Sequence, residues 1–473
     1  MLDIAGMVPV FISLRPHRPA RLLLQLLDQL DLLYKSMTNH HEFINELKEV
    51  LLRLKQLIAL LALSLVVISG CAEEEEKVVE GKLRIMYWDN HNFANDYGTL
   101  IASRFPELDY EVAAMNGVDD LSAFINEEQP DIIFAPSYED YLQFIDQSLL
   151  LPLDPRIQPG SYDIEDIQPG VVQMLRSNEH QQLFGLSPAF SSQVLYYNKD
   201  LFKRYAIEEP VNQMTWEQVF ATAGRFHTAD DAAGFSVNYT SYDLVEMIGN
   251  TVGLRVITSN GEQIGILKDT EKWVDILEDI QTAVQQGSVA LPGSAPVITE
   301  EMIDKELFLA GKSAMSVGRP DLLYRYIQSD ANFDLGIVTA PVDPNFPDST
   351  YSYRIDSIFG IHSASSMPDE AWEVIKLITG DEMAGIKAKY SNQLSTRAKY
   401  LTEVNGIALN PFYELSYDNR IFKKPNTSSK FGRSFFVMMS EELENLLLDK
   451  QSAEVTVKKI KEQGEVLLAL EKD

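Results

Sequence analysis

From Lys82 onward, short apolar segments alternate with longer segments whose apolar residues recur at helical spacing. The short segments predict strands over 83–88, 110–115, 132–135, 182–186, 194–197, 235–238, 313–317, 333–339 and 357–362. The longer segments predict helices over 97–105, 121–126, 138–149, 215–226, 242–252, 271–286, 300–310, 369–379, 441–448 and 453–470. Strand–helix repeats of this length are typical of parallel βαβ units with helices on the faces of a sheet. The pattern therefore predicts an α/β fold.

Local signals support single elements of this pattern. Thr215 is expected to cap the helix over 215–226, because its hydroxyl can accept a hydrogen bond from a free backbone N–H in the first turn. Glu217 and Gln218 follow in that turn, as acidic and amide side chains often do.

One apolar segment, residues 57–68, differs from the rest because it contains no charged residue. It is too short to cross a bilayer, which takes about 20 residues. Arg53 and Lys55 precede it, and the small residues Ser69 and Gly70 follow it. A basic region, an apolar region and small residues in this order are typical of a signal peptide. The polar run over 72–76 that comes next predicts a tether.

Cys71 is the single cysteine of the chain, which excludes an internal disulfide and any site built from several cysteines. The run Ile68-Ser69-Gly70-Cys71 resembles a bacterial lipobox. The resemblance implies cleavage before Cys71 and lipidation of its thiol. It places the protein outside the cytoplasm, anchored to the cell membrane by lipid on the outer face of the cytoplasmic membrane or in the periplasm. The alternative is a short transmembrane anchor with an incidental cysteine.

The segment over 1–50 is long for a signal peptide, which runs to about 30 residues. We expect residues 1–70 to comprise the signal peptide and an over-extended N-terminus, with the true start near Met37 or Leu51. The alternative is an additional N-terminal helix. Residues 71–81 are expected to form the lipidated tether.

The chain is strongly acidic, with 40 Lys and Arg against 70 Asp and Glu and a formal net charge of −30. This charge repels phosphate backbones and anionic headgroups, which argues against nucleic-acid binding. It suits a monomer. The length of 473 residues predicts two or three domains at roughly 100–200 residues each.

Motifs of enzymes are incomplete in this sequence. Gly311-Lys312-Ser313 resembles the end of a P-loop, but Glu306 stands where the first glycine belongs. Ser191 and Ser192 lack the flanking glycines of a nucleophile elbow. The histidines after the leader show no zincin spacing, and no EF-hand loop is present. We expect no enzymatic activity, no metal and no cofactor.

Several segments carry a family resemblance through their order and spacing: 82–88, 130–136, 183–188, 194–202, 215–217, 308–315, 394–397 and 447–467. Together they resemble the family 1 extracellular solute-binding proteins of ABC importers, which include maltose and multiple-sugar binders. The resemblance implies a two-lobed periplasmic-binding-protein-like fold of type 2, in which each lobe is a sheet flanked by helices and a hinge joins the lobes.

The family pattern also implies where the chain passes between the lobes: near 188–194, 350–357 and 394–397. The N-terminal lobe would comprise 82–188 and 355–396, and the C-terminal lobe 189–354 and 397–473. The implied function is to capture a sugar or oligosaccharide in the cleft and deliver it to the transmembrane subunits of an ABC permease. A sensor or interaction lipoprotein, or a polysaccharide-active enzyme, remains an alternative.

Candidate solute contacts follow from two rules. Open α/β sheets bind ligands beyond the carboxyl ends of their strands, and sugar sites combine aromatic faces with planar polar groups. The residues at predicted strand ends and crossings that satisfy these rules are Trp88, Asn90, Ser137, Tyr138, Phe190, Ser191, Tyr239, Arg319, Arg354 and Asp356.

Each candidate has a structural alternative. Trp88 could belong to the core, Ser137 could cap a helix, and Phe190 with Ser191 could serve the hinge alone. Arg319 and Arg354 could bind a carboxylate or sulfate, or they could pair with Asp321 and Asp356. Family members often have an aromatic residue after the glycine at 318, whereas this chain has Arg319, which bears on whether the solute is a neutral sugar.

Overall fold

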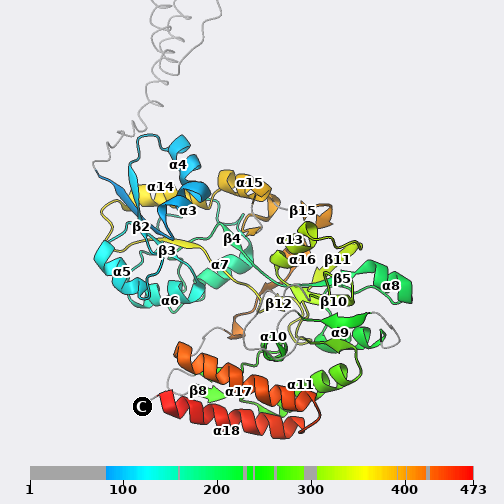
Figure 1. Ribbon diagram of the computed structural model, residues 1–473. Coiled ribbons are helices and arrows are strands. Elements are labelled where there is room, and N and C mark those ends of the chain that lie inside the picture. The colour runs from blue at the N-terminus through cyan, green and yellow to red at the C-terminus, as the bar shows by residue number, and fades with distance from the viewer. Residues whose placement is uncertain are drawn as a thin grey trace, which may run out of the picture. The chain divides into compact units, whose positions relative to one another are not determined.

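The computed structural model describes residues 81–157, 160–226, 232–237, 240–259, 264–291, 306–390, 393–400, 402–421 and 427–471. The predictions for residues 1–80, including that for Cys71, lie outside these ranges. Within them the chain forms two main sheets, each covered by helices (Figure 1). Among the described residues, none of the helices combines the length and the apolarity that a membrane crossing requires.

The first sheet has the strand order β13-β3-β1-β2. Its strands are β1 (Leu83–Tyr87), β2 (Tyr110–Ala114), β3 (Ile132–Ala135) and β13 (Ile358–Ile361). β1 runs parallel to β2 and β3, while β13 pairs antiparallel with β3. Every residue of β3 and β13 is buried, as expected for strands that are covered on both faces.

Helices of two chain regions surround the first sheet. They are α3 (Asn90–Phe93), α4 (Thr99–Arg104), α5 (Leu121–Glu128), α6 (Tyr138–Asp146), α7 (Pro169–Arg176), α14 (Pro368–Ile378) and α15 (Asp381–Tyr390), with a π-helical turn over Ala94–Gly98. Pro169 and Pro368 stand at the first helical position, where the missing N–H costs no hydrogen bond.

The second sheet has the order β11-β5-β10-β6-β9. Its strands are β5 (Val194–Asn198), β6 (Ala233–Ser236), β9 (Val289–Ala290), β10 (Ser313–Gly318) and β11 (Leu335–Thr339). β5 pairs antiparallel with β10 and β11, and β6 runs parallel to β10 and β9.

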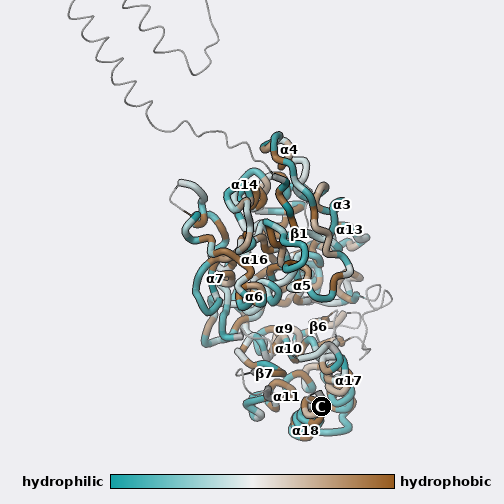
Figure 2. Tube along the Cα trace, turned by 90° about the vertical axis from the view of Figure 1, so that its left-hand side faces the viewer, coloured by the Kyte–Doolittle hydropathy of each residue, from teal (hydrophilic) through white to brown (hydrophobic). Residues whose placement is uncertain are grey.

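Helices again cover this sheet: α8 (Lys199–Tyr205), α9 (Trp216–Gly224), α10 (Ser241–Thr251), α11 (Thr270–Gln285), α13 (Pro320–Gln328), α16 (Pro411–Glu414), α17 (Ser429–Leu447) and α18 (Ala453–Glu471). Thr215 caps α9 in a capping box with Gln218, which confirms that prediction. The core of this region includes Trp273, Phe202 and Phe235. In Figure 2, hydrophobic positions, coloured brown, are interspersed with hydrophilic positions, coloured teal, along the trace.

Short pairings complete the described structure. They are β4 (Ala189–Phe190) with β14 (Leu394–Ser395), β12 (Ser349–Thr350) with β17 (Ser416–Tyr417), β7 (Ile257–Ser259) with β8 (Ile264–Ile266), and β15 (Glu403–Val404) with β16 (Ile407–Ala408). Single 3-10 turns cover Ala398–Tyr400 and Asn419–Ile421.

The predicted α/β alternation is confirmed, with corrections to single elements. The expected strand over 182–186 is wrong, since only Leu186 forms an isolated bridge, to Phe359. Residues 307–311 form turns rather than the end of a helix, and residues 300–305 of that prediction lie outside the described ranges. The helix predicted over 441–448 begins earlier, at Ser429.

Three extended segments lie side by side where the chain passes between the two sheets. Ser191 and Arg354 exchange backbone hydrogen bonds of 2.8 Å in both directions. Phe190 pairs with Leu394, and the N–H of Thr396 donates to the carbonyl of Pro188 over 3.1 Å. The segments around 190, 354 and 395 therefore form one hydrogen-bonded group.

Arg397, directly after the third of these segments, is buried in an ionic network. Its Nε donates to the carbonyl of Thr379 over 2.9 Å, and its Nη1 lies 3.1 Å from Asp166 and 3.2 Å from Asp381. Lys399 reaches the same Asp166 carboxylate at 2.6 Å. The network ties the segment after β14 to the helices of the first sheet.

Candidate functional site

Strand register brings several predicted residues to one edge of the first sheet. Ile85 pairs with Ile132, so Trp88 lies level with Ala135, three residues further along both strands. Ala135 in turn pairs with Ile358. The residues that follow β1 and β3, and those that precede β13, therefore share an edge at the carboxyl ends of the parallel strands, where open α/β sheets bind ligands.

Trp88 presents an indole ring at this edge. Its exposed fraction is 38%, which excludes the alternative of a core position. The ring packs edge to face against Phe134, with centroids 5.6 Å apart and an interplanar angle of 69°. One side of the indole is thus held by the sheet, and the exposed part can stack on the apolar face of a ligand.

Asp89 organises two carboxamides beside Trp88. Its Oδ2 accepts from the Nδ2 atoms of Asn92 and Asn116 at 2.7 Å each, and its Oδ1 accepts from the backbone N–H of Asn92 at 2.8 Å. These hydrogen bonds, chiefly that from the Asn92 backbone, hold the pKa of Asp89 below its usual range. Asn90 begins α3 and is exposed. The cluster provides oriented amides that suit hydroxyl groups.

Ser137 and Tyr138, at the end of β3, serve the fold. Ser137 is the N-cap of α6, where its Oγ accepts from the N–H of Asp140. Tyr138 is only 8% exposed, and its hydroxyl donates to the carbonyl of Met174 over 2.8 Å. Burial raises the pKa of this phenol. Both side chains thus make structural contacts, and neither belongs to the solute site that we propose.

A pocket of about 230 Å³ lies at the crossing segments. It brings together four of the predicted residues with residues of the second sheet's α13 and of the third crossing. The lining includes Phe190, Ser191, Arg319, Asp321, Asp356 and Gln393.

Arg319 follows β10 and stands at the N-cap of α13. Its Nη1 donates to the carbonyl of Ser352 over 3.0 Å and lies 3.3 Å from the Oγ of Ser191. Its own carbonyl accepts from the hydroxyl of Tyr196 over 2.7 Å. Arg319 therefore links the second sheet to two of the crossing segments while it lines the pocket.

Carboxylates at the pocket have cationic neighbours from this chain. Arg354 donates from Nε to Asp356 over 2.6 Å. These two residues therefore pair with each other, as one of the two alternatives predicted. Asp321 lies 3.6 Å from Arg325 in the next turn of α13. The pocket thus presents carboxylate oxygens as hydrogen-bond acceptors, and the neighbouring arginines partly balance their negative charge.

Phe190 forms the apolar part of the pocket and is itself almost fully buried. It stacks on Tyr353, with centroids 5.3 Å apart and planes 18° apart. Tyr413 packs against it edge to face at 5.3 Å. Aromatic rings of three distant chain regions therefore back the pocket.

The remaining predicted residue, Tyr239, lies outside the described residues. Asn116 and Gln393 were missed by the sequence analysis. Asn116 follows the end of β2, so the strand-end rule applied to that strand would have found it. Gln393 directly precedes β14, where only the crossing itself was expected.

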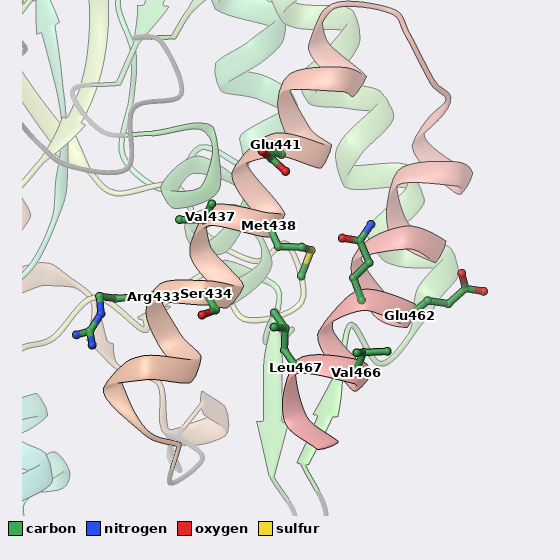
Figure 3. Close-up of a pocket in the computed structure, with 9 residues that line it drawn as sticks. Arg433, Ser434, Val437, Met438, Glu441, Glu462, Val466 and Leu467 are labelled. Carbon is green, nitrogen blue, oxygen red and sulfur yellow. The ribbon is translucent and has the colours of Figure 1, made fainter. Parts of the chain in front are cut away.

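A larger pocket, of about 670 Å³, lies between α17 and α18 (Figure 3). Val437, Met438, Val466 and Leu467 give it an apolar floor, with Arg433 toward one end. It lies between two helices, away from the strand ends and from the crossing segments. Ser434, Glu441, Glu462 and Gln463 complete its lining. We place the solute at the crossing segments instead, because ligand sites occur preferentially where two domains meet. No cluster suited to a metal ion occurs in the described part of the chain.

One family of known proteins matches more than half of this chain. The sequence profile of the bacterial extracellular solute-binding proteins matches residues 106–385. A putative binding protein of Brucella abortus is 22% identical over 248 residues, which span 50% of this chain and 55% of that protein. The sn-glycerol-3-phosphate-binding periplasmic protein UgpB of Pectobacterium atrosepticum is 23% identical over 304 residues, 60% of this chain and 66% of that protein. The chain thus spans little more than half of the first of these relatives.

Solved structures share the fold. A sugar transporter from Rhizobium etli in an open conformation matches with a TM-score of 0.62 and 18% identity, over 81% of this chain and 99% of that one. A family 1 extracellular solute-binding protein from Alicyclobacillus acidocaldarius matches with a TM-score of 0.65 and 13% identity, over 82% and 98%. These likenesses confirm the predicted two-lobed α/β fold with a hinge.

Proposed function

Because this chain belongs to the bacterial extracellular solute-binding proteins, we propose that it captures a carbohydrate between its lobes and delivers it to the permease of an ABC importer. The observation that carries the proposal is the pocket at the crossing segments, which combines the Phe190 ring with Ser191, Arg319 and Asp356. The exposed indole of Trp88 and its neighbouring amides would supply a second contact surface at the edge of the first sheet.

The lobes of this proposal follow the crossing segments. The N-terminal lobe comprises residues 82–188 and 355–396, and the C-terminal lobe comprises 189–354 and 397–473. Each contains one main sheet. Rotation about the three crossing segments would close the lobes around the solute, as in hinge motions of other two-lobed binders.

Charge favours a sugar over a phosphorylated solute. The relatives include binders of both kinds, since one is a glycerol-3-phosphate-binding protein and one solved structure is a sugar transporter. Asp321 and Asp356 line the pocket and would repel a phosphate dianion. The Nη1 of Arg319 is already engaged by Ser352 and Ser191. We therefore propose an uncharged polyhydroxy solute.

A thermal-shift screen tests the proposed function. The mature chain would be melted with mono- and oligosaccharides, with glycerol 3-phosphate and with glycerophosphocholine. A ligand at 100 times its Kd adds about 2.7 kcal/mol to the free energy of unfolding, which corresponds to about 3 °C in Tm for a chain of roughly 400 residues. We expect such a shift with a sugar and none with glycerol 3-phosphate. A shift with the phosphate alone would contradict the sugar proposal, and no shift with any solute would contradict solute binding at this site.

We also propose that lipid on Cys71 anchors the protein to the outer side of the cell membrane, because the sequence before Cys71 has the order of a signal peptide and a lipobox. Stable anchoring needs more than one acyl chain. Labelled palmitate should enter the wild-type protein, and the Cys71→Ser variant should incorporate none. Ser69→Ala is the matched control, because it leaves the thiol in place and keeps a small residue before it, so this variant should keep the label. Equal labelling of wild type and Cys71→Ser would exclude this anchor.

A further inference from the structure

The segment over 411–417, which contains α16 and β17, makes contacts with both lobes. On the side of the C-terminal lobe, Ser416 and Tyr417 pair in parallel with Ser349 and Thr350. Phe412 is buried against the ring of Tyr196 in β5, with centroids 6.3 Å apart. The segment is therefore fixed to the second sheet.

On the side of the N-terminal lobe, Gln168 is hydrogen-bonded to this segment. It directly precedes α7, and its Nε2 donates to the carbonyl of Tyr413 over 2.9 Å and to the hydroxyl of Tyr353 over 2.8 Å. The Tyr353 hydroxyl in turn donates to the carbonyl of Leu415 over 2.9 Å. One amide group thus ties α7 to the segment both directly and through Tyr353.

A second tie runs to the third crossing segment. The hydroxyl of Tyr413 donates to the carbonyl of Ser395 over 3.0 Å. The approach of α7 is also close, because a Cβ built on Gly170 would lie 2.7 Å from the Tyr353 ring. A methyl group has no room there, so α7 and Tyr353 are packed as tightly as their backbones allow.

We propose that the 411–417 segment is a fourth, noncovalent connection between the lobes, which restricts rotation about the three crossing segments. The inference rests on the lobe boundaries of the proposed function. The covalent crossings are extended and pair with one another through few hydrogen bonds. The 411–417 segment adds hydrogen bonds and ring contacts that must break or rearrange when the lobes rotate relative to each other. The rings of Tyr353 and Tyr413 also touch Phe190, which lines the pocket. The orientation of the lobes is thereby linked to the wall of the solute site.

The test measures the distance between the lobes in the absence of any solute. Cys71 is the single cysteine, so Cys71→Ser gives a chain in which two introduced cysteines take all the label. Glu127 in α5 and Glu278 in α11 are exposed and belong to different lobes. Nitroxide labels on Glu127→Cys and Glu278→Cys report the interlobe distance distribution by pulsed electron resonance.

Gln168→Leu removes two hydrogen bonds with little change in volume, and each net hydrogen bond contributes about fivefold to an equilibrium constant. We expect the ratio of displaced to docked orientations to rise roughly 25-fold in this variant and about fivefold in Tyr413→Phe. Tyr141→Phe is the matched control. It also removes a buried tyrosine hydroxyl, which donates to the carbonyl of Leu175 over 3.1 Å, but both partners lie in the N-terminal lobe.

Circular dichroism and melting establish that each variant is folded. If Gln168→Leu does not fold, Tyr413→Phe decides the question. An unchanged distribution in the folded variants would overturn the proposal, and so would equal broadening in Tyr141→Phe. Because no solute is added, these outcomes are independent of the ligand screen. A failed screen would leave the distance result intact, and the reverse also holds.

Discussion

Replacing Arg397 with methionine is expected to lower the free energy of unfolding by about 3–5 kcal/mol, because it removes one partner of a buried ionic network. Arg397 is buried beside Asp166 and Asp381 and donates to the carbonyl of Thr379. Methionine retains a long aliphatic side chain. The loss therefore comes from a carbonyl without its donor and from two carboxylates without their guanidinium.

Equilibrium unfolding in urea measures this change. Arg104→Met is the matched control, since Arg104 pairs with Glu382 at the exposed surface, with hydrogen bonds of 2.7 and 2.5 Å. Exposed pairs contribute about 0–1 kcal/mol, so the control should change little. Equal losses in the two variants would contradict the structural role assigned to Arg397.

The same network gives a pH dependence of defined sign. Burial raises the pKa of Asp166, but hydrogen bonds and charges of Lys399 and Arg397 outweigh burial and hold the pKa below its usual range. A carboxyl with a lowered folded-state pKa stabilises the fold fully above its unfolded pKa, which is about 3.9 for aspartate. The stabilisation is lost as the pH falls through the lower folded-state pKa. In Arg397→Met we expect the free energy of unfolding to depend less steeply on pH in this acidic range. Urea unfolding at a series of pH values measures this dependence.

Replacing Trp88 with alanine is expected to weaken solute binding about tenfold or more, once the screen has identified a ligand. The exposed part of the indole would be covered by the solute, and the apolar area lost corresponds to about 1.4 kcal/mol or more. Isothermal titration calorimetry measures the Kd. The Tm of the free protein should fall as well, because the substitution also removes the side of the ring that packs against Phe134. The Kd is therefore measured at a temperature at which both proteins are folded.

Phe346→Ala provides the control for this variant. Phe346 is also a large exposed ring, 49% accessible, and it lies under the guanidinium of Arg420 at 3.9 Å. It takes no part in the pocket at the crossing segments. The Kd of Phe346→Ala should match that of the wild type. Wild-type affinity in Trp88→Ala would remove Trp88 from the proposed site.

The sequence predicts the α/β alternation because the buried strands are short and apolar, as over 132–135 and 358–361. The helices that begin at Pro169 and Pro320 are absent from the predicted elements. In both helices the proline occupies the first turn, where it is tolerated. The π-helical turn before α4 has no local sequence signal of its own.

The strand-end rule selected Trp88, which is exposed, and Arg319, which lines the pocket, because the rule needs only the ends of strands. Asp356 came from the expected second crossing and also lines the pocket. The strand-end rule could not separate Trp88 from Tyr138. Tyr138 is covered by α7, whose Met174 carbonyl lies 36 residues further along the chain. The contact between Gln168 and Tyr413 joins residues 245 positions apart, and no local pattern reports such a pair.

The antiparallel pairing of β13 with β3 has a consequence for biosynthesis. Ile358 pairs with Ala135, so the first sheet closes only after a further 358 − 135 = 223 residues have been made. At about 5–20 residues per second, the ribosome supplies β13 roughly 10–45 s after β3. Until then β3 has an open edge, and closing so long a loop is slow. The first sheet therefore cannot be completed until residues 358–361 have been synthesised, long after its other three strands.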